Sequence, residues 1–546
     1  MSTLSMREHQ MFPVLDAAQI ETARRFASGP ARRFAPGETI YAIAERDAPA
    51  WLVLEGAIDV MRRDGLSLEA PITTHRAGQF SGEVNQLAGR PSIAAGLAGP
   101  DGCVALPFDP AHLRALMVGS ADVGELVMRA LILRRVSLIE EGGAGTILIG
   151  VPGSPDLVRL QGFLARSGFP NLVLDAGAEG EGRALVERTG MRPDELPLVV
   201  CPSGALLRRP GEAELAACLG LTPTLDPAAV YDVAVVGAGP AGLATAVYAA
   251  SEGLSVIVLD EHATGGQAGA SARIENYLGF PTGISGQALA GRAVNQALKF
   301  GAEIVLPVRI EGLDCSGPLL TLQLEGDRRI EARAIVVASG ARYRRPDIPD
   351  LASFEGAGIS YWATPVEARL CAGEEIALVG GGNSAGQAVV FLAPKVKRLH
   401  LVVRRPLKAT MSRYLIDRIA ALPNVEIHVG TEITQLEGDR ASGLSAAVFI
   451  RHSDGGVYRR ALRHIFLFIG ADPNSGWLQH CVEVDAKGFV VTGMGTLPLE
   501  TSRPGVFAIG DVRAGSTKRV AAAVGEGAAV VAQIHAMIAQ RAKEPA

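Results

Sequence analysis

A glycine-rich turn between two apolar segments, within residues 231–260, restricts the fold of this chain more than any other feature. The turn contains Gly237, Gly239 and Gly242 in the spacing G-x-G-x-x-G, and an alanine-rich segment follows it. In such a unit the first glycine permits a tight turn, the second lets the backbone approach a pyrophosphate, and the third lets the helix pack on the strand. The second apolar segment ends in Asp260, at the usual spacing for an acid that binds a ribose hydroxyl. The segment therefore predicts a parallel α/β unit that holds a dinucleotide at a helix N-terminus.

The same arrangement recurs in residues 377–405, with a basic ending. The residues expected to approach this second nucleotide are Gly380, Gly382, Asn383, Ser384 and Ala385. The strand that follows ends in Arg404 and Arg405, where the first unit has an acid. Because guanidinium groups bind phosphate oxygens in pairs, this ending favours the 2′-phosphate of NADPH. A solvated basic turn is the alternative interpretation.

Composition excludes several classes of protein. A chain of 546 residues is long enough for three to four domains, and its net charge of −5 gives no electrostatic reason to bind nucleic acid. Glycine and proline interrupt the apolar stretches, so we expect no membrane span, and the polar start lacks the apolar core of a signal peptide. The six cysteines are scattered without a C-x-x-C pair, which predicts free thiols, no metal site and a cytoplasmic location.

Three units follow one another along the chain. Residues 1–140 alternate short apolar runs with turn residues and then show helical periodicity, which predicts a small β-barrel followed by a helix. Residues 145–222 begin with a strand–helix–strand pattern and continue with a strand entered through Pro197. Residues 230–546 alternate strands and helices around the two glycine-rich turns. The predicted fold class is therefore multi-domain α/β with two Rossmann-like dinucleotide-binding domains.

The C-terminal part resembles a known family. The segment Phe507-Ala508-Ile509-Gly510-Asp511, preceded by Thr501, is similar to the second FAD signature of flavoproteins with two dinucleotide-binding domains. Four further motifs match, in order, the Gly-Gly-Gln, Glu-Asn, Ala-Thr-Gly-Ala and Arg-Gln-Ala elements of low-molecular-weight thioredoxin reductases. These motifs are Gly265-Gly266-Gln267, Glu275-Asn276, Ser339-Gly340-Ala341 and Lys518-Arg519-Val520-Ala521. Residues 230–546 are thus similar to the thioredoxin reductases of the pyridine nucleotide-disulfide oxidoreductase family.

This resemblance implies a domain order and a set of cofactors. Two halves of an FAD-binding domain, residues 230–345 and 470–546, would flank an NADPH-binding domain, residues 346–469. The resemblance also implies hydride transfer from NADPH to FAD, and a homodimer. The FAD contacts that it implies are Gln267, Asn276, Gly510, Asp511, Arg519, Val520 and Ala521, in addition to the first turn and its acid. The last three would lie at a helix N-terminus, which stabilises negative charge on reduced flavin.

The chain departs from the family at the redox disulfide. Family members carry Cys-Ala-Thr-Cys where this chain has Trp362-Ala363-Thr364-Pro365. Since Trp362 and Pro365 have no ionisable sulfur, dithiol exchange is lost at these two catalytic positions. We expect Cys371, six residues beyond, to be an ordinary free cysteine. The electron acceptor is therefore unidentified: an external disulfide, a quinone or another small molecule.

Residues 145–222 resemble a thioredoxin or glutaredoxin. Pro197 matches the cis-proline that precedes a strand in that fold. The loop after the first strand, residues 152–156, lacks the cysteines that the fold uses for dithiol exchange.

Residues 1–140 resemble a cyclic-nucleotide-binding domain, in which Gly82 and Glu83 would bind the ribose. The arginine that the family places on the cyclic phosphate is missing near Ser92, and Arg90 is out of register. A degenerate, structural or partner-docking domain is therefore favoured over cyclic nucleotide binding.

Two alternative functions stay open. Some relatives without the disulfide transfer single electrons, so the chain could be a ferredoxin- or flavodoxin-NADP reductase with a basic docking face at Arg342, Arg344 and Arg345. It could also be a redox or nucleotide sensor with little turnover, because both N-terminal units lack signature residues of the families that they resemble.

Overall fold

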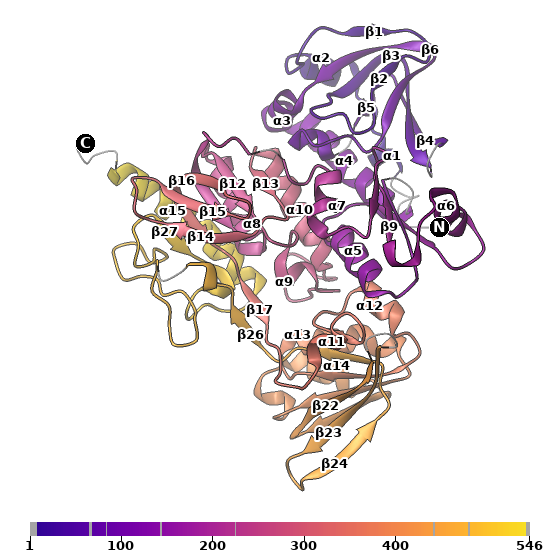
Figure 1. The fold of residues 1–546 in the computed structure, drawn as a ribbon. Coiled ribbons are helices and arrows are strands. Elements are labelled where there is room, and N and C mark those ends of the chain that lie inside the picture. The colour runs from indigo at the N-terminus through magenta and orange to yellow at the C-terminus, as the bar shows by residue number, and fades with distance from the viewer. Residues whose placement is uncertain are drawn as a thin grey trace.

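The computed structural model describes residues 8–64, 68–82, 84–141, 145–223, 225–439, 443–478 and 481–541. The strands pair within four units. In Figure 1 the first unit lies at the top and the fourth at the bottom, and the second and third units lie between them.

The first unit is an antiparallel sheet with helices. Its strands are β1 (Arg32–Phe34), β2 (Thr39–Tyr41), β3 (Ala50–Asp64), β4 (Leu68–Arg76), β5 (Phe80–Ser81) and β6 (Ala95–Phe108). Its helices are α1 (Glu8–Met11), α2 (Ala17–Arg24), α3 (Pro110–Gly119) and α4 (Ala121–Glu141). Side chains alternate along β3, so that Trp51 and Leu52 are buried in different apolar clusters. Short antiparallel strands followed by a helix were expected and are found, whereas closure into a barrel stays a prediction.

The second unit is a four-stranded mixed sheet in the order β10-β9-β7-β8. Its strands are β7 (Thr146–Gly150), β8 (Asn171–Asp175), β9 (Leu198–Val200) and β10 (Leu206–Arg208), and its helices are α5 (Pro155–Arg166), α6 (Glu181–Thr189) and α7 (Glu212–Cys218). The parallel β7–α5–β8 start confirms the expected strand–helix–strand pattern. The peptide bond before Pro197, at the entrance of β9, is cis.

The third unit is built on a seven-stranded sheet. Its strands are β11 (Val230–Val236), β12 (Val256–Leu259), β13 (Glu303–Val305), β14 (Ile310–Asp314), β15 (Leu320–Leu324), β16 (Arg328–Val337) and β27 (Val506–Ala508). Its helices include α8 (Pro240–Ser251), α9 (Gly266–Gly269), α10 (Gly286–Lys299) and α15 (Val520–Arg541). Strands β13, β12, β11, β16 and β27 are parallel, which confirms the α/β unit expected for residues 231–260. Their carboxyl ends share one edge, where the first glycine turn follows β11 and Gly510 follows β27.

The fourth unit repeats the parallel plan and adds a small antiparallel sheet. Its parallel strands are β18 (Ile359–Ser360), β19 (Glu375–Val379), β20 (Arg398–Val403), β21 (Val425–Val429) and β25 (His464–Leu467), and its antiparallel strands are β22 (Thr431–Asp439), β23 (Gly443–Arg451) and β24 (Gly456–Arg460). Its helices include α11 (Leu351–Phe354), α12 (Pro365–Leu370), α13 (Asn383–Leu392) and α14 (Arg413–Ala420). The chain enters and leaves through an antiparallel ribbon of β17 (Ala341–Tyr343) and β26 (Ala471–Pro473). The second predicted strand–turn–helix–strand unit is thus found as β19–α13–β20.

Helix α15 is, within the described part of the chain, the one helix whose length and composition would allow it to cross a membrane. It packs along α8 in the third unit: the Thr245 hydroxyl donates a hydrogen bond to the Gly527 carbonyl at 3.4 Å. A Cβ atom on Gly527 would lie only 2.6 Å from the Ala241 carbonyl oxygen. Val530, Val531 and Ile534 of α15 are buried in the same apolar cluster as Leu243 and Val247 of α8.

The cysteines are arranged differently from the sequence-based expectation. Cys201 is bonded to Cys218, and Cys315 is bonded to Cys481, so the prediction that all six thiols are free is wrong. Spacing along the sequence gave no hint, because the partners of the second pair are 166 residues apart and are brought together only by the fold. The expectation for Cys371 is confirmed: it is free and buried.

Candidate cofactor site

A cavity of about 2020 Å³ lies where the second, third and fourth units meet. This volume is about twice the upper end of the range for a site that holds one small ligand. The predicted FAD contacts that line it are Gly237, Gly239, Asp260, Gln267, Asn276, Gly510, Asp511, Arg519, Val520 and Ala521. Motifs separated by more than 250 residues thus converge on one space.

The first glycine turn leaves room for a ligand on one side only. A Cβ atom on Gly237 would lie 2.2 Å from the Ala338 carbonyl oxygen, and one on Gly242 would lie 1.8 Å from the Gly237 carbonyl oxygen. The nearest atom to a Cβ atom on Gly239 would be 3.9 Å away, in the adjacent turn. Gly237 and Gly242 are therefore required by packing, whereas Gly239 keeps the cavity side open at the N-terminus of α8. This geometry fits a pyrophosphate.

Asp260 closes the ribose end of the turn. Its carboxylate accepts hydrogen bonds from the backbone N–H groups of Ala238 at 2.7 Å, His262 at 2.8 Å and Ala263 at 3.1 Å. Burial raises the pKa of Asp260 above its usual range, and these hydrogen bonds oppose the shift. Since each carboxylate oxygen has two lone pairs, acceptor capacity remains for ribose hydroxyls.

The opposite end of the cavity is formed around the start of α15. Burial raises the pKa of Asp511, and the Lys518 ammonium donates to the Asp511 carbonyl at 2.5 Å. The N–H of Gly510 donates to the Glu526 carboxylate at 2.6 Å, and Arg513 forms an ion pair with the same carboxylate. Sequence reasoning missed Glu526 and Arg513, since neither lies in a recognisable motif. Together they fix the loop that carries Asp511.

Tyr343 is a cavity residue that the sequence did not indicate. It lies on the β17 ribbon and lines the cavity, where burial raises the pKa of its hydroxyl to about 12. Ala341, on the same strand, accepts a hydrogen bond from the Gln267 side chain. The Gly265-Gly266-Gln267 motif and the ribbon of β17 and β26 are therefore in direct contact.

The predicted NADPH contacts are only partly at the cavity. Asn383 and Ser384 line it, and the Asn383 side chain also accepts the N–H of Ser412 at 2.7 Å. The remaining predicted contacts, which do not line the cavity, are Gly380, Gly382, Ala385, Arg404 and Arg405. The glycine turn follows β19, and the arginine pair follows the adjacent parallel strand β20, so both lie at the same edge of the sheet. Both arginines are exposed there.

The two positions that carry cysteine in the family differ in their surroundings. Trp362 lines the cavity with 37% of its surface exposed, and its Nε1–H donates to the Glu367 carboxylate at 3.0 Å. Pro365 is the first residue of α12 and does not line the cavity. Burial raises the pKa of the nearest cysteine in sequence, Cys371, to about 11, so its thiol is unreactive at neutral pH.

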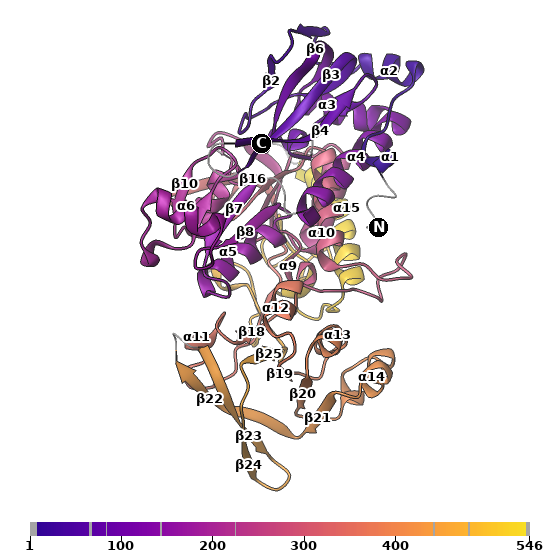
Figure 2. The ribbon, with the colours of Figure 1, turned by 90° about the vertical axis from the view of Figure 1, so that its right-hand side faces the viewer.

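The second unit closes the cavity from the other side. Its loop 152–156 is part of the lining, and the Arg166 guanidinium lies 5.5 Å from the centre of the Trp362 ring. The Arg166 carbonyl accepts a hydrogen bond from Thr264 of the third unit at 3.4 Å. The end of α5 therefore contacts both nucleotide-binding units. In Figure 1 and Figure 2, α5 lies near α9 of the third unit and α12 of the fourth.

Two residues of the candidate cyclic nucleotide site make hydrogen bonds to other parts of the chain. Glu83 lies outside the described residues, and the Gly82 carbonyl accepts a hydrogen bond from the buried Arg134 at 3.0 Å. Arg90, the possible substitute for the phosphate-binding arginine, donates to the Ile304 carbonyl of the third unit at 3.1 Å. Arg90 thus links two units instead of facing a cyclic phosphate.

Two nucleotide-binding α/β units that share one cavity define a dinucleotide-dependent oxidoreductase. Residues 231–527 match the family model described as pyridine nucleotide-disulphide oxidoreductase, and the chain belongs to this family. Thioredoxin reductase family proteins use FAD and NADPH, so the predicted enzyme class and cofactors are confirmed. The match begins at residue 231, so both N-terminal units lie outside it.

Individual relatives cover the same part of the chain. The NADPH-dependent thioredoxin reductase 3 of Arabidopsis thaliana is 33% identical over 303 residues, which are 55% of this chain and 56% of that protein. A thioredoxin reductase of Mycolicibacterium smegmatis is 32% identical over 302 residues, 55% of this chain and 94% of the relative. The crystal structure of Lactococcus lactis thioredoxin reductase, in its FR conformation, superposes with a TM-score of 0.53 at 26% identity, covering 57% of this chain and 99% of that one. The chain thus spans about half the length of the first relative and nearly all of the other two.

Proposed function

We propose that this protein is a flavin-dependent NADPH oxidoreductase that delivers electrons from FAD directly to an acceptor in the cavity, without a thiol relay. The observation that carries the proposal is the pair Trp362 and Pro365 at the positions of the family's redox cysteines. A disulfide reductase of this type needs a thiolate beside the flavin. Among the described residues that line the cavity, none is a cysteine.

Each side of the cavity supports this proposal. Cys371 is buried, and its pKa is raised to about 11. The loop 152–156 of the second unit lines the cavity at the place where a thioredoxin would carry its thiols, and it contains none. The disulfide partners Cys201 and Cys218 do not line the cavity.

The roles of the residues follow from their positions. The turn at Gly239 and the N-terminus of α8 would hold the FAD pyrophosphate, and Asp260 would hold its ribose. FAD, when bound, supplies the hydride and electron chemistry. The N-terminus of α15, at Val520, stabilises negative charge in the cavity. Trp362 and Arg166 both line the cavity, where they would form one wall of the acceptor site.

The experiment is anaerobic reduction of the purified, FAD-containing protein with NADPH, followed by a screen of quinones, small disulfides and other oxidised acceptors. We expect FAD to copurify and to be bleached by NADPH, and we expect reoxidation by at least one small acceptor. We also expect no useful turnover when insulin precipitation is coupled through thioredoxin. A protein that refuses FAD, or whose flavin NADPH does not reduce, contradicts the proposal.

Two variants test the route of the electrons. Cys371→Ser should leave reduction and reoxidation of the flavin unchanged. If the unaltered chain does reduce thioredoxin and this variant does not, Cys371 carries the chemistry and the proposal is wrong. Trp362→Cys combined with Pro365→Cys restores the family's cysteine spacing. It should give partial thioredoxin reduction at best, because two substitutions do not rebuild a docking surface for thioredoxin.

The electron-transferase alternative is weakened by the ion pairs at its expected docking face. Arg344 pairs with Asp472 at 2.8 Å, and Arg345 pairs with Glu355 at 2.9 Å, so two of the three arginines are already neutralised. The sensor alternative is favoured by the contact of Arg166 with both nucleotide-binding units, since flavin reduction could alter this contact. Fast turnover with a physiological acceptor would count against it.

The proposal also includes a family assignment for each of the two N-terminal units. A cyclic-nucleotide-binding-like unit, residues 1–140, and a thioredoxin-like unit, residues 145–222, agree with the strand patterns observed. These two assignments, the cytoplasmic location and the homodimer stay predictions.

A further inference from the structure

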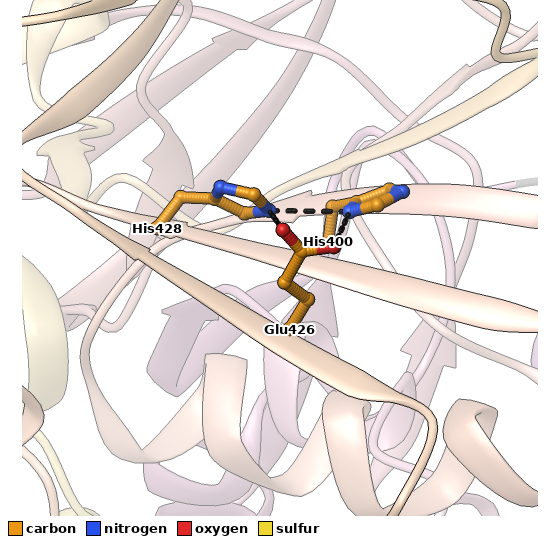
Figure 3. Close-up of side chains that lie close together, drawn as sticks. All are labelled: His400, Glu426 and His428. Atoms are coloured by element: carbon orange, nitrogen blue, oxygen red, sulfur yellow. Dashed lines mark hydrogen bonds and ion pairs between the residues drawn. The ribbon is translucent and has the colours of Figure 1, made fainter.

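Three potential metal ligands lie together on two neighbouring strands of the fourth unit, away from the cavity. His400 is on β20, and Glu426 and His428 are on β21 (Figure 3). In the parallel register His400 is opposite Glu426, and His428 is two residues further along the same strand. Since alternate residues of a strand point to the same face, all three side chains project to one side of the sheet.

The distances among the ligand atoms match a metal coordination sphere. His400 Nδ1 lies 3.1 Å from His428 Nε2 and 3.4 Å from the Glu426 carboxylate, and His428 Nε2 lies 3.5 Å from the same carboxylate. A tetrahedral ion with bonds of about 2.0–2.1 Å separates its ligand atoms by about 3.3 Å. An ion can therefore be placed by shifts of a few tenths of an ångström.

We infer that His400, Glu426 and His428 form a binding site for a divalent transition-metal ion of the zinc class, with water as the fourth ligand. Two imidazoles and one carboxylate are a donor set that zinc uses when one position stays open. The open position lies on the solvent side, since the side chain of Glu426 is 43% exposed and that of His428 is 10% exposed, while His400 is fully buried. The inference is independent of the proposed function.

The two nitrogens that face the cluster, His400 Nδ1 and His428 Nε2, are here called the inner nitrogens, and the other nitrogen of each ring is the outer one. The Tyr458 hydroxyl lies 3.3 Å from His428 Nδ1, and a Glu375 carboxylate oxygen lies 3.6 Å from His400 Nε2, which has no closer hydrogen-bond partner among the described residues. Both outer nitrogens therefore face an oxygen atom, and the tautomer that carries its proton on the outer nitrogen turns the lone pair of the inner nitrogen toward the ion.

The competing interpretation is a metal-free pair in which His428 Nε2–H donates to His400 Nδ1. Two cations on the same face support that state: Arg460 and Arg398 lie 3.4 and 3.7 Å from the Glu426 carboxylate and partly neutralise it. Arg451 also acts on His428 electrostatically. These charges weaken metal binding relative to a closed site with four protein ligands. They do not block it, because Arg398 and Arg460 are partly exposed and can move toward water.

The ion would have a structural consequence. Strand β21 is the edge of the parallel sheet, and the site would cross-link it to β20. Because β20 leads directly into Arg404 and Arg405, the ion would also stiffen the strand that carries the expected 2′-phosphate contacts.

The test is titration of untagged, FAD-containing protein with zinc chloride after treatment with a chelator, followed by calorimetry and elemental analysis. We expect one zinc per chain. Glu426→Gln and His428→Gln should each weaken binding by more than about tenfold, and Tyr458→Phe, which removes only an outer partner, by about tenfold. His452→Gln is the matched control, since His452 and Glu432 form an exposed pair at 3.2 Å, and it should bind zinc like the unaltered chain.

Flavin content and circular dichroism establish that each variant is folded. Glu426 and His428 are chosen because they are partly exposed, so their substitution disturbs the core less than that of His400. Absence of zinc binding by the unaltered chain overturns the inference, and so does binding that is unchanged in both ligand variants. Equal loss in the His452→Gln control would show that the ion binds elsewhere.

Discussion

Replacing Gly242 with alanine should destabilise the FAD-binding unit by steric conflict within the protein. A Cβ atom at this position would lie 1.8 Å from the Gly237 carbonyl oxygen and 3.1 Å from a Val235 methyl group. Because the closest atom is backbone at a tight turn, the conflict cannot be relieved by a side-chain rotation. Overpacking typically costs about 1–3 kcal/mol, and we expect the upper end here. The gain in helix propensity from glycine to alanine, about 1 kcal/mol, opposes it and is smaller.

Alanine substitutions at two further glycines distinguish an effect on packing from an effect on ligand binding. Gly291 lies on α10 with nothing within 4 Å of its Cβ position, so Gly291→Ala should gain stability from helix propensity alone. Gly239 has 3.9 Å of clearance, so Gly239→Ala should fold normally. Its methyl group would instead occupy the space expected for the pyrophosphate, and loss of a hydrogen bond to a charged group weakens FAD binding about tenfold to a hundredfold.

Thermal unfolding and FAD content distinguish the three variants. A net cost of about 2 kcal/mol lowers the melting temperature of a domain of 150–250 residues by about 4–8 °C, so Gly242→Ala should melt lower even when saturated with FAD. Gly239→Ala should retain the melting temperature of the apoprotein but lose FAD on gel filtration. A Gly242→Ala variant with unchanged stability, or a Gly239→Ala variant with full FAD content, would refute the assignment of the two roles.

Three other outcomes follow from the structure. Arg404→Ala combined with Arg405→Ala should raise the Kd for NADPH about tenfold to a hundredfold and leave that for NADH unchanged, and equal effects on both would show that the phosphate site is misplaced. Calorimetry with cyclic AMP should show weak binding or none, since Arg90 is held by the third unit, and micromolar affinity would contradict this. Burial and the neighbouring Arg134 hold the pKa of His75 well below its reference value of about 6.5. Below pH 6.5 the unfolded chain therefore binds a proton at His75 that the native state does not bind. The free energy of unfolding of the first unit should then fall by up to about 1.4 kcal/mol per pH unit. Hydrogen exchange of β3 and β4 should show this loss, and His75→Gln should abolish it.

The parts of the fold that sequence could predict are those set by local pattern. The turn at Gly237 lies between β11 and α8 as expected, and Asp260 follows β12, because apolar runs and glycine spacing act over fewer than 30 residues. The convergence of this turn with Asp511 also follows, since parallel strands β11, β16 and β27 end at one edge.

The parts that sequence could not predict depend on contacts between distant segments. The pairing of Cys315 with Cys481 requires the third unit to be assembled from both halves of the chain. Glu526, which accepts the hydrogen bond of the Gly510 N–H, is the seventh residue of α15, and an acid inside a helix ordinarily indicates only a solvated face. The contact of Arg166 with Trp362 depends on how the second unit docks, and no motif encodes docking.

The described residues that line the cavity include no cysteine, and this agrees with the proposed transfer of electrons without a thiol relay. A thiol relay from flavin to a tethered thioredoxin needs sulfur at two facing places: beside the flavin and on the loop of the docked unit. Here the first place has Trp362, the second is the loop 152–156, and both line the same cavity. Arg166 also lines the cavity, and its guanidinium lies 5.5 Å from the centre of the Trp362 ring, where a relay would need free access for a second disulfide. A chain that had lost only one end of a relay would keep a reactive thiol at the other, whereas this arrangement supports direct transfer from flavin to an acceptor in the cavity.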